Sequence, residues 1–218
     1  MKPHDYLPRI LVLLLVPLMS AATGPDTYHN DFEKAKPGKL PADFMVLDGS
    51  FAVRQIDGNK CLELAPDPIG MFGVLFGPAG SAAVDVKARV WSKPTGMRFP
   101  EFGVGAGDAG GWKLWLVPGQ HALELRQADE TKATTHFDWP AGKWTWLRLR
   151  VRPDKSGGWV IEGKAWPQDG KEPPAWQITA TDKEPPPAGR ASLWGVPFSE
   201  QPIRFDDLKM GAADGPTR

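Results

Sequence analysis

Cysteine is almost missing from this sequence of 218 residues, which contains only Cys61. One cysteine excludes an internal disulfide, so the fold must be stabilised by a hydrophobic core rather than by disulfide bonds. The neighbouring residues Lys60 and Leu62 supply no base that would activate the thiol. We therefore expect Cys61 to be a small buried hydrophobic residue rather than an exposed reactive thiol.

An excess of charge is also missing, because 26 Lys and Arg residues face 26 Asp and Glu residues. A nucleic-acid or anionic-membrane partner would need a basic excess. The charge balance therefore argues against both kinds of partner.

Long apolar runs are rare, and the clearest one lies at residues 10–19. Lys2 and Arg9 precede it and the small residues Ser20-Ala21-Ala22 follow it, as in a secretory signal peptide. The run is about half the length of a membrane span. We expect cleavage after about Ala22 and a periplasmic or secreted protein without a membrane span, with retention of the leader as an anchor as the alternative.

Clear helical periodicity is absent, whereas alternation is plain in residues 145–152. Thr145, Leu147, Leu149 and Val151 alternate there with tryptophan and arginine, which predicts a strand with one core face. A turn at 153–158 and a second apolar stretch at 159–166 complete a predicted antiparallel hairpin.

Short strand patterns separated by Gly, Pro and Asp turns fill the rest of the chain. Only residues 121–130 (HALELRQADE) have helix-forming composition, and their leucines alternate, so we predict a strand there too. Strands are expected at 28–32, 51–56, 60–65, 73–77, 82–91, 99–107, 112–117, 122–128, 134–137, 145–152, 159–166, 176–180, 191–196 and 203–210. This spacing is typical of an all-β sandwich or jelly roll.

The domain organisation follows from these patterns. We expect a signal peptide at 1–22, a flexible lead-in at 23–27, one β-sandwich domain at 28–210 and a frayed tail at 211–218. The Pro-rich segments 167–175 and 183–189 are interpreted as surface loops of that domain, because each adjoins only one or two strands.

Several motifs resemble concanavalin A-like lectin/glucanase domains, the laminin-G-like jelly rolls of secreted bacterial proteins. The matching residues are Asn30-Asp31-Phe32-Glu33, Trp144, Leu147, Leu149, Val151, Trp159, Lys164-Ala165-Trp166, Glu172-Pro173, Trp176, Gly189-Arg190 and Phe205-Asp206-Asp207. The resemblance covers roughly residues 28–210 and implies a two-sheet antiparallel jelly-roll sandwich with one concave sheet. That superfamily includes sugar-binding modules, glycoside hydrolases and lyases, so the resemblance leaves function open.

The acidic pattern of the laminarinase-like enzymes in that superfamily, Glu-x-Asp-x-x-Glu, is missing here. Retaining glycosidases need two carboxylates about 5 Å apart. We therefore expect a module without catalysis that binds carbohydrate or another extracellular ligand, such as a protein. A polysaccharide hydrolase or lyase, and a structural domain of an envelope assembly, are the alternatives.

The candidate binding residues are Glu101, Trp115, Glu124 and Arg126. Strand parity turns them away from their leucine, phenylalanine and valine neighbours, so three adjacent strands would place them on one surface. A tryptophan ring with polar groups beside it is a common sugar-binding arrangement. The alternative is that Trp115 packs under a loop and the charges form a solvated face.

A second candidate surface is the row Arg148, Arg150 and Arg152, near several tryptophans. Such a row would suit an acidic polysaccharide. The alternative is an ordinary outer sheet face, on which arginine stems cover aromatic rings and pair with neighbouring acids.

No cofactor is expected, although a structural calcium ion would suit Asp31, Asp206 and Asp207 if the first and last strands pair. The alternative is that the two adjacent aspartates bind turn backbone. His29, His121 and His136 stand apart in the sequence and are expected to remain isolated.

Overall fold

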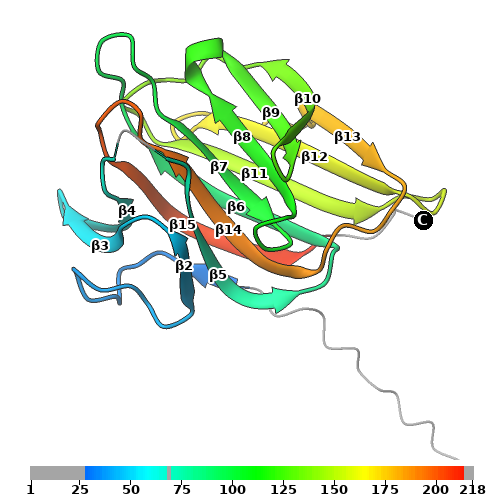
Figure 1. The fold of residues 1–218 in the computed structure, drawn as a ribbon, viewed down its shortest axis with the longest axis horizontal. Coiled ribbons are helices and arrows are strands. Elements are labelled where there is room, and N and C mark those ends of the chain that lie inside the picture. Colours follow the sequence, from blue (N-terminus) through cyan, green and yellow to red (C-terminus); the bar gives the residue numbers. More distant parts are fainter. Residues whose placement is uncertain (1–27, 68–69, 214–218) are drawn as a thin grey trace, which may run out of the picture.

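Two antiparallel β-sheets form the part of the chain that the structure, a computed structural model, describes: residues 28–67 and 70–213 (Figure 1). The predicted signal peptide at 1–22 and lead-in at 23–27 lie outside these residues. Sheet A contains β1 (Tyr28–Asn30), β3 (Phe51–Ile56), β4 (Asn59–Leu64), β6 (Val84–Trp91), β11 (Thr145–Pro153), β12 (Trp159–Pro167), β13 (Ile178–Asp182) and β15 (Ile203–Ala212). Sheet B contains β2 (Phe44–Asp48), β5 (Phe72–Gly80), β7 (Glu101–Ala106), β8 (Trp112–Val117), β9 (Ala122–Gln127), β10 (Glu130–His136) and β14 (Gly189–Val196).

The strand order mixes early and late parts of the chain. Sheet A runs β13-β12-β11-β6-β15-β4-β3, with β1 paired to β15, and sheet B runs β10-β9-β8-β7-β14-β5-β2. Sheet B lies in front of sheet A in the view of Figure 1. The described residues thus form the two-sheet antiparallel jelly-roll sandwich that the sequence predicts.

The core lies between the sheets and follows strand parity. Leu147, Leu149 and Val151 of β11 are at most 1% exposed, and they belong to one cluster with Phe102 and Val104 of β7. The predicted hairpin forms as β11 and β12, paired from Thr145 opposite Pro167 to Pro153 opposite Trp159. Alternation therefore identifies the buried face correctly.

Several boundaries differ from the predictions. Strand β2 was not predicted, because Met45, Val46 and Leu47 are consecutive apolar residues and show no alternation in the sequence. In the structure all three side chains are exposed. Gly211 and Ala212 were assigned to the frayed tail, but they pair with Asp85 and Val84 and extend β15. Residues 122–127 form a strand rather than a helix, as expected.

The lone cysteine, Cys61, is 1% exposed, as predicted. Burial, followed by the nearby Asp206 carboxylate, raises the pKa of its thiol to about 12.

Residues 28–67 and 70–213 include no helix long and apolar enough to span a membrane. The only regular helical element among them is η1 (Pro118–Gln120), one short turn between β8 and β9.

Candidate functional site

The outer face of sheet B carries the four candidate residues on three adjacent strands. Glu101 begins β7, Trp115 lies in the middle of β8, and Glu124 and Arg126 lie on β9. Trp115 is directly opposite Gly103 on one side and Glu124 on the other. The structure therefore brings all four together, as strand parity predicts.

Hydrogen bonds and ion pairs link these side chains. The Trp115 indole Nε1 donates to Glu101 Oε2 at 2.8 Å, and Arg126 Nε donates to Glu124 Oε2 at 2.7 Å. Arg126 Nη1 lies 3.9 Å from Glu101 Oε2, and the guanidinium carbon lies 5.0 Å from the centre of the Trp115 ring. Thr131 adds a hydroxyl donor to Glu124 at 3.2 Å. Arg126 is thus the centre of the group.

The Trp115 ring is buried, with 1% of its surface exposed. A Cβ atom at Gly103 would lie 2.9 Å from ring carbon Cε3, so the ring lies flat over the glycine of the neighbouring strand. Trp194 lies over Gly73 in the same way, with 2.6 Å to ring carbon Cζ3. Arg126 covers the exposed side of Trp115. The ring therefore supports the surface and does not present an open stacking platform, which the sequence could not show.

Lys113 is a site residue that the sequence analysis did not select. Its side chain is only 3% exposed, and Nζ donates to the Ala128 carbonyl at 3.0 Å and lies 4.6 Å from the centre of the Trp194 ring. Burial lowers the pKa of this ammonium group, while Asp129 opposes and Arg126 adds to the effect. The signal was present in the sequence, since parity places Lys113 on the same face as Trp115.

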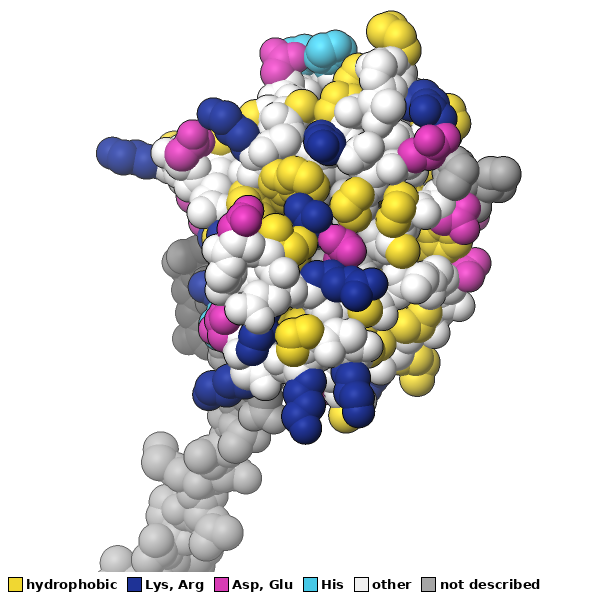
Figure 2. Space-filling view, turned by 90° about the vertical axis from the view of Figure 1, so that its left-hand side faces the viewer, with side chains coloured by type: hydrophobic (Ala, Val, Ile, Leu, Met, Phe, Trp, Pro, Cys, Tyr) yellow, Lys and Arg dark blue, Asp and Glu magenta, His cyan; other side chains and the backbone are white. Residues whose placement is uncertain are grey.

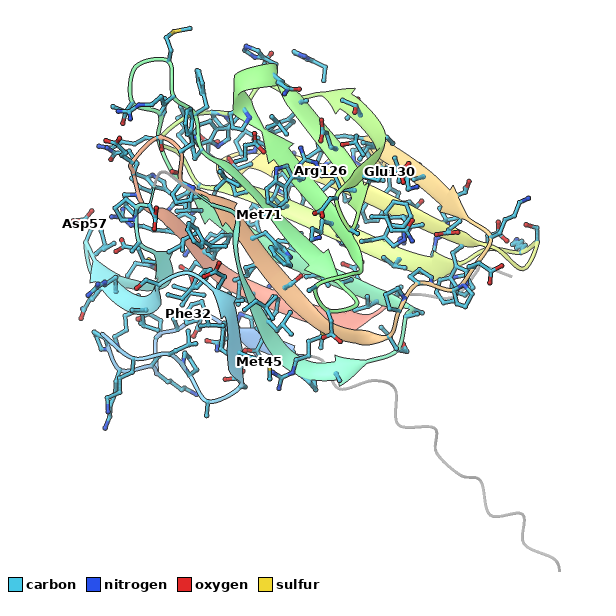
Figure 3. All side chains as sticks on the ribbon, in the orientation of Figure 1. Phe32, Met45, Asp57, Met71, Arg126 and Glu130 are labelled. Carbon is cyan, nitrogen blue, oxygen red and sulfur yellow. The ribbon has the colours of Figure 1, made fainter. Side chains whose placement is uncertain are left out.

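A small cavity of about 190 Å³ opens beside this group. Its lining residues come from the position before β5, from β8 and β9, and from the turn after β9: Met71, Lys113, Trp115, Arg126, Ala128 and Asp129. Figure 3 shows Met71 and Arg126 on the side of sheet B that faces the viewer. The cavity therefore offers cationic donors, one carboxylate and an apolar methionine to a small polar ligand.

The arginine row of β11 on sheet A is paired rather than open. Arg148 binds Asp85 at 2.7 Å, and Arg150 and Arg152 both bind Glu162, at 2.8 and 3.1 Å. The alternative interpretation, an outer sheet face with arginines paired to neighbouring acids, is confirmed for this row.

The predicted calcium ligands bind other partners. β1 and β15 do pair, but Arg89 reaches Asp206 at 2.7 Å and Asp207 at 2.8 Å, and the Asp31 carboxylate accepts the Glu33 backbone N–H. In the described ranges no group of three or more His, Cys, Asp or Glu side chains is arranged to hold a metal ion. These contacts lend calcium no support, and calcium binding there stays a prediction.

Two histidines that we expected to be isolated are neighbours. His121 and His136 stack with ring centres 6.1 Å apart, and both bind Asp138, at 2.8 and 3.1 Å. The expectation was wrong because residues 15 positions apart meet where β9 and β10 pair. The two hydrogen bonds lower the pKa of Asp138.

Comparisons with known proteins support the fold. No family model matches the chain, and no curated protein matches it in sequence. Among solved structures, the chain is similar to the carbohydrate-binding module CBM66 from Bacillus subtilis, with a TM-score of 0.53, 12% identity, and coverage of 78% of this chain and 96% of that one.

Two further structures show the same likeness. The Emp47p carbohydrate recognition domain has a TM-score of 0.54 at 9% identity, covering 86% of this chain and 95% of that one. The apo Crh5 transglycosylase has a TM-score of 0.59 at 11% identity, covering 86% and 85%. The chain therefore has a concanavalin A-like jelly-roll fold, and identities this low establish the fold alone.

Proposed function

We propose that this chain is a secreted module without catalytic activity that binds carbohydrate on the outer face of β7, β8 and β9. The observation that carries the proposal is the convergence of Glu101 and Glu124 on Arg126, whose side chain lines the 190 Å³ cavity. Sugar hydroxyl groups both donate and accept hydrogen bonds, and this surface offers both carboxylates and cations. The likeness to a carbohydrate-binding module and a carbohydrate recognition domain supports the same proposal.

The cavity size indicates how much of a sugar the site takes. Ligand pockets usually measure about 300–1,000 Å³, so a 190 Å³ cavity accepts the edge of one sugar unit. Because Trp115 is covered, recognition depends on polar contacts and not on ring stacking. Modest affinity for single sugars is the expected result.

A glycan array followed by calorimetry tests the proposal. We expect at least one saccharide to bind, and Glu101→Gln and Arg126→Gln to weaken it about tenfold, which equals 1.4 kcal/mol. The matched control is Arg98→Gln, which removes an exposed ion pair with Glu200 outside the site. No binding by any saccharide, or equal binding by all variants, would contradict the proposal.

A polysaccharide hydrolase or lyase is the second candidate, because two carboxylates, Glu101 and Glu124, flank one guanidinium. Both are held by donors, Glu101 by an indole N–H and Glu124 by Arg126 and Thr131. This arrangement fixes their positions and favours binding over proton transfer. If the purified protein cleaves a glycan and Glu124→Gln abolishes the cleavage, the protein is an enzyme and the proposal of a binding module is wrong.

A structural role in an envelope assembly has one supporting observation. Met45, Val46 and Leu47 of the edge strand β2 are 53%, 40% and 41% exposed. An exposed apolar edge strand is a common pairing surface. Sedimentation of the wild-type protein as an oligomer, and of Val46→Lys as a monomer, would favour this role.

A further inference from the structure

Trp144, the residue before β11, lies between two cavities on the outer face of sheet A. One cavity of about 310 Å³ is lined by Gly142, Lys143, Trp144, Gln168 and Asp169. The other, of about 220 Å³, is lined by Ile56, Asp57, Asn59, Cys61, Trp91, Trp144 and Arg204. The ring is half-buried, so part of its surface remains in contact with solvent, unlike that of Trp115.

Arg89 organises the polar groups around this ring. Its guanidinium carbon lies 4.7 Å from the centre of the Trp144 ring and so covers one side of it. Arg89 Nη1 donates to Gln168 Oε1 at 2.8 Å, and Nη2 donates to Asp206 at 2.7 Å. Because the amide oxygen of Gln168 is bound to Arg89, its NH₂ group is directed away from the guanidinium.

Two donors are left available. Among residues 28–67 and 70–213, no group accepts a hydrogen bond from the Trp144 indole Nε1 or from Gln168 Nε2. Trp91, by contrast, donates to the Gly142 carbonyl at 2.8 Å and is covered by Arg204 at 4.4 Å. The larger cavity thus combines an accessible indole with donors that a ligand could use.

The charges around the two cavities balance. Lys143 and Asp169 pair at 3.5 Å on the rim of the larger cavity, and the smaller one has Asp57 and Arg204 in its lining. Figure 2 shows the neighbouring end of the sandwich, where basic, acidic and hydrophobic side chains are interspersed. A balanced rim favours an uncharged ligand, because a charged one would leave part of its charge unpaired.

We propose that Trp144 and Gln168 form a second saccharide-binding site, which takes a neutral oligosaccharide of pyranose units with equatorial hydroxyl groups. Such units present an apolar C–H face that can lie against an indole, while their ring-edge hydroxyls accept hydrogen bonds from amide and indole N–H groups. A volume of 310 Å³ falls within the range of small-ligand pockets.

This site is separate from the one proposed on sheet B. Trp144 and Arg89 lie on the outer face of sheet A, whereas Arg126 lies on the outer face of sheet B. In Figure 3, Asp57 from the smaller cavity is at the left end of the sandwich and Arg126 is near the middle of sheet B. Either site can therefore exist without the other.

The test follows the indole N–H signals of the ¹⁵N-labelled protein during titration with cellotetraose, with tetragalacturonate as the acidic counterpart. Trp144→Phe assigns the Trp144 signal. We expect cellotetraose to shift this signal, and Gln168→Ala to weaken the binding that the signal reports about tenfold. Arg98→Gln, which removes an exposed ion pair outside both sites, should leave that binding unchanged. Gln168 is exposed, so its substitution should preserve the fold, and exposed Gln120→Ala is the matched control.

Three results would overturn this second site. They are an unshifted Trp144 signal in cellotetraose, equal binding by wild-type protein and Gln168→Ala, and binding of tetragalacturonate as tight as that of cellotetraose. If cellotetraose does not shift the Trp144 signal and Arg126→Gln abolishes cellotetraose binding, the sheet B site is the one that binds the saccharide.

Discussion

Glu172 is the residue whose substitution tests the electrostatics of sheet A most directly. It lies in the loop between β12 and β13 and accepts from three cations: Arg148 at 2.6 Å, Lys164 at 2.7 Å and Lys87 at 3.3 Å. Partial burial alone would raise its pKa, but hydrogen bonds from Lys164 and Arg148, with Lys87 nearby, lower the pKa from 4.5 to about 2. Glu172→Gln removes the charge that these cations share.

The magnitude follows from that pKa. A fall from 4.5 to about 2 corresponds to roughly 3 kcal/mol at full strength. The side chain is 30% exposed, so solvent screening reduces the expected contribution to about 1–2 kcal/mol. Because the folded-state pKa is depressed, this stability is fully present above pH 4.5 and is lost as the pH falls toward about 2.

Urea unfolding followed by tryptophan fluorescence measures the effect. We expect Glu172→Gln to lower the free energy of unfolding by about 1–2 kcal/mol near pH 7, and by clearly less near pH 3. Glu130→Gln is the matched control, since Glu130 is 72% exposed and, among the described residues, forms an ion pair with Lys132 alone. A gap between wild-type protein and Glu172→Gln that is equal at both pH values would refute the reasoning.

Three further predictions concern separate parts of the chain. Cys61, with a thiol pKa of about 12, should resist iodoacetamide near pH 8 in the folded protein and react after denaturation, as mass spectrometry would show; rapid native alkylation would contradict its burial. Gly103→Ala would place a Cβ 2.4 Å from the Leu114 carbonyl oxygen and 2.9 Å from Trp115, so we expect a loss of about 1–3 kcal/mol, against almost none for Gly110→Ala, where nothing lies within 4 Å. Expression with the natural leader should yield an exported protein that begins after about Ala22 in its intact mass, and an uncleaved chain would favour a retained anchor.

Strand parity is what the sequence could determine by itself. Neighbouring residues on a strand point to opposite faces, so alternation alone assigned Leu147, Leu149 and Val151 to the core and Trp115, Glu124 and Arg126 to the outer face. The turn residues between the alternating stretches then predicted the hairpins. These features depend on residues that are close in the sequence, so they could be predicted from the sequence and they agree with the structure.

Pairing between distant segments was decided only by the tertiary structure. Trp144 is partly exposed to solvent and Trp115 is buried, and this difference depends on what lies over each ring. For Trp115 the covering groups include Gly103 of another strand and the Arg126 guanidinium. The Arg89 contacts with Gln168 and Asp206 join residues more than 75 positions apart. Sequence periodicity shows which way a side chain points, but not which side chain from another strand covers it, and that covering determines which tryptophan can meet a ligand.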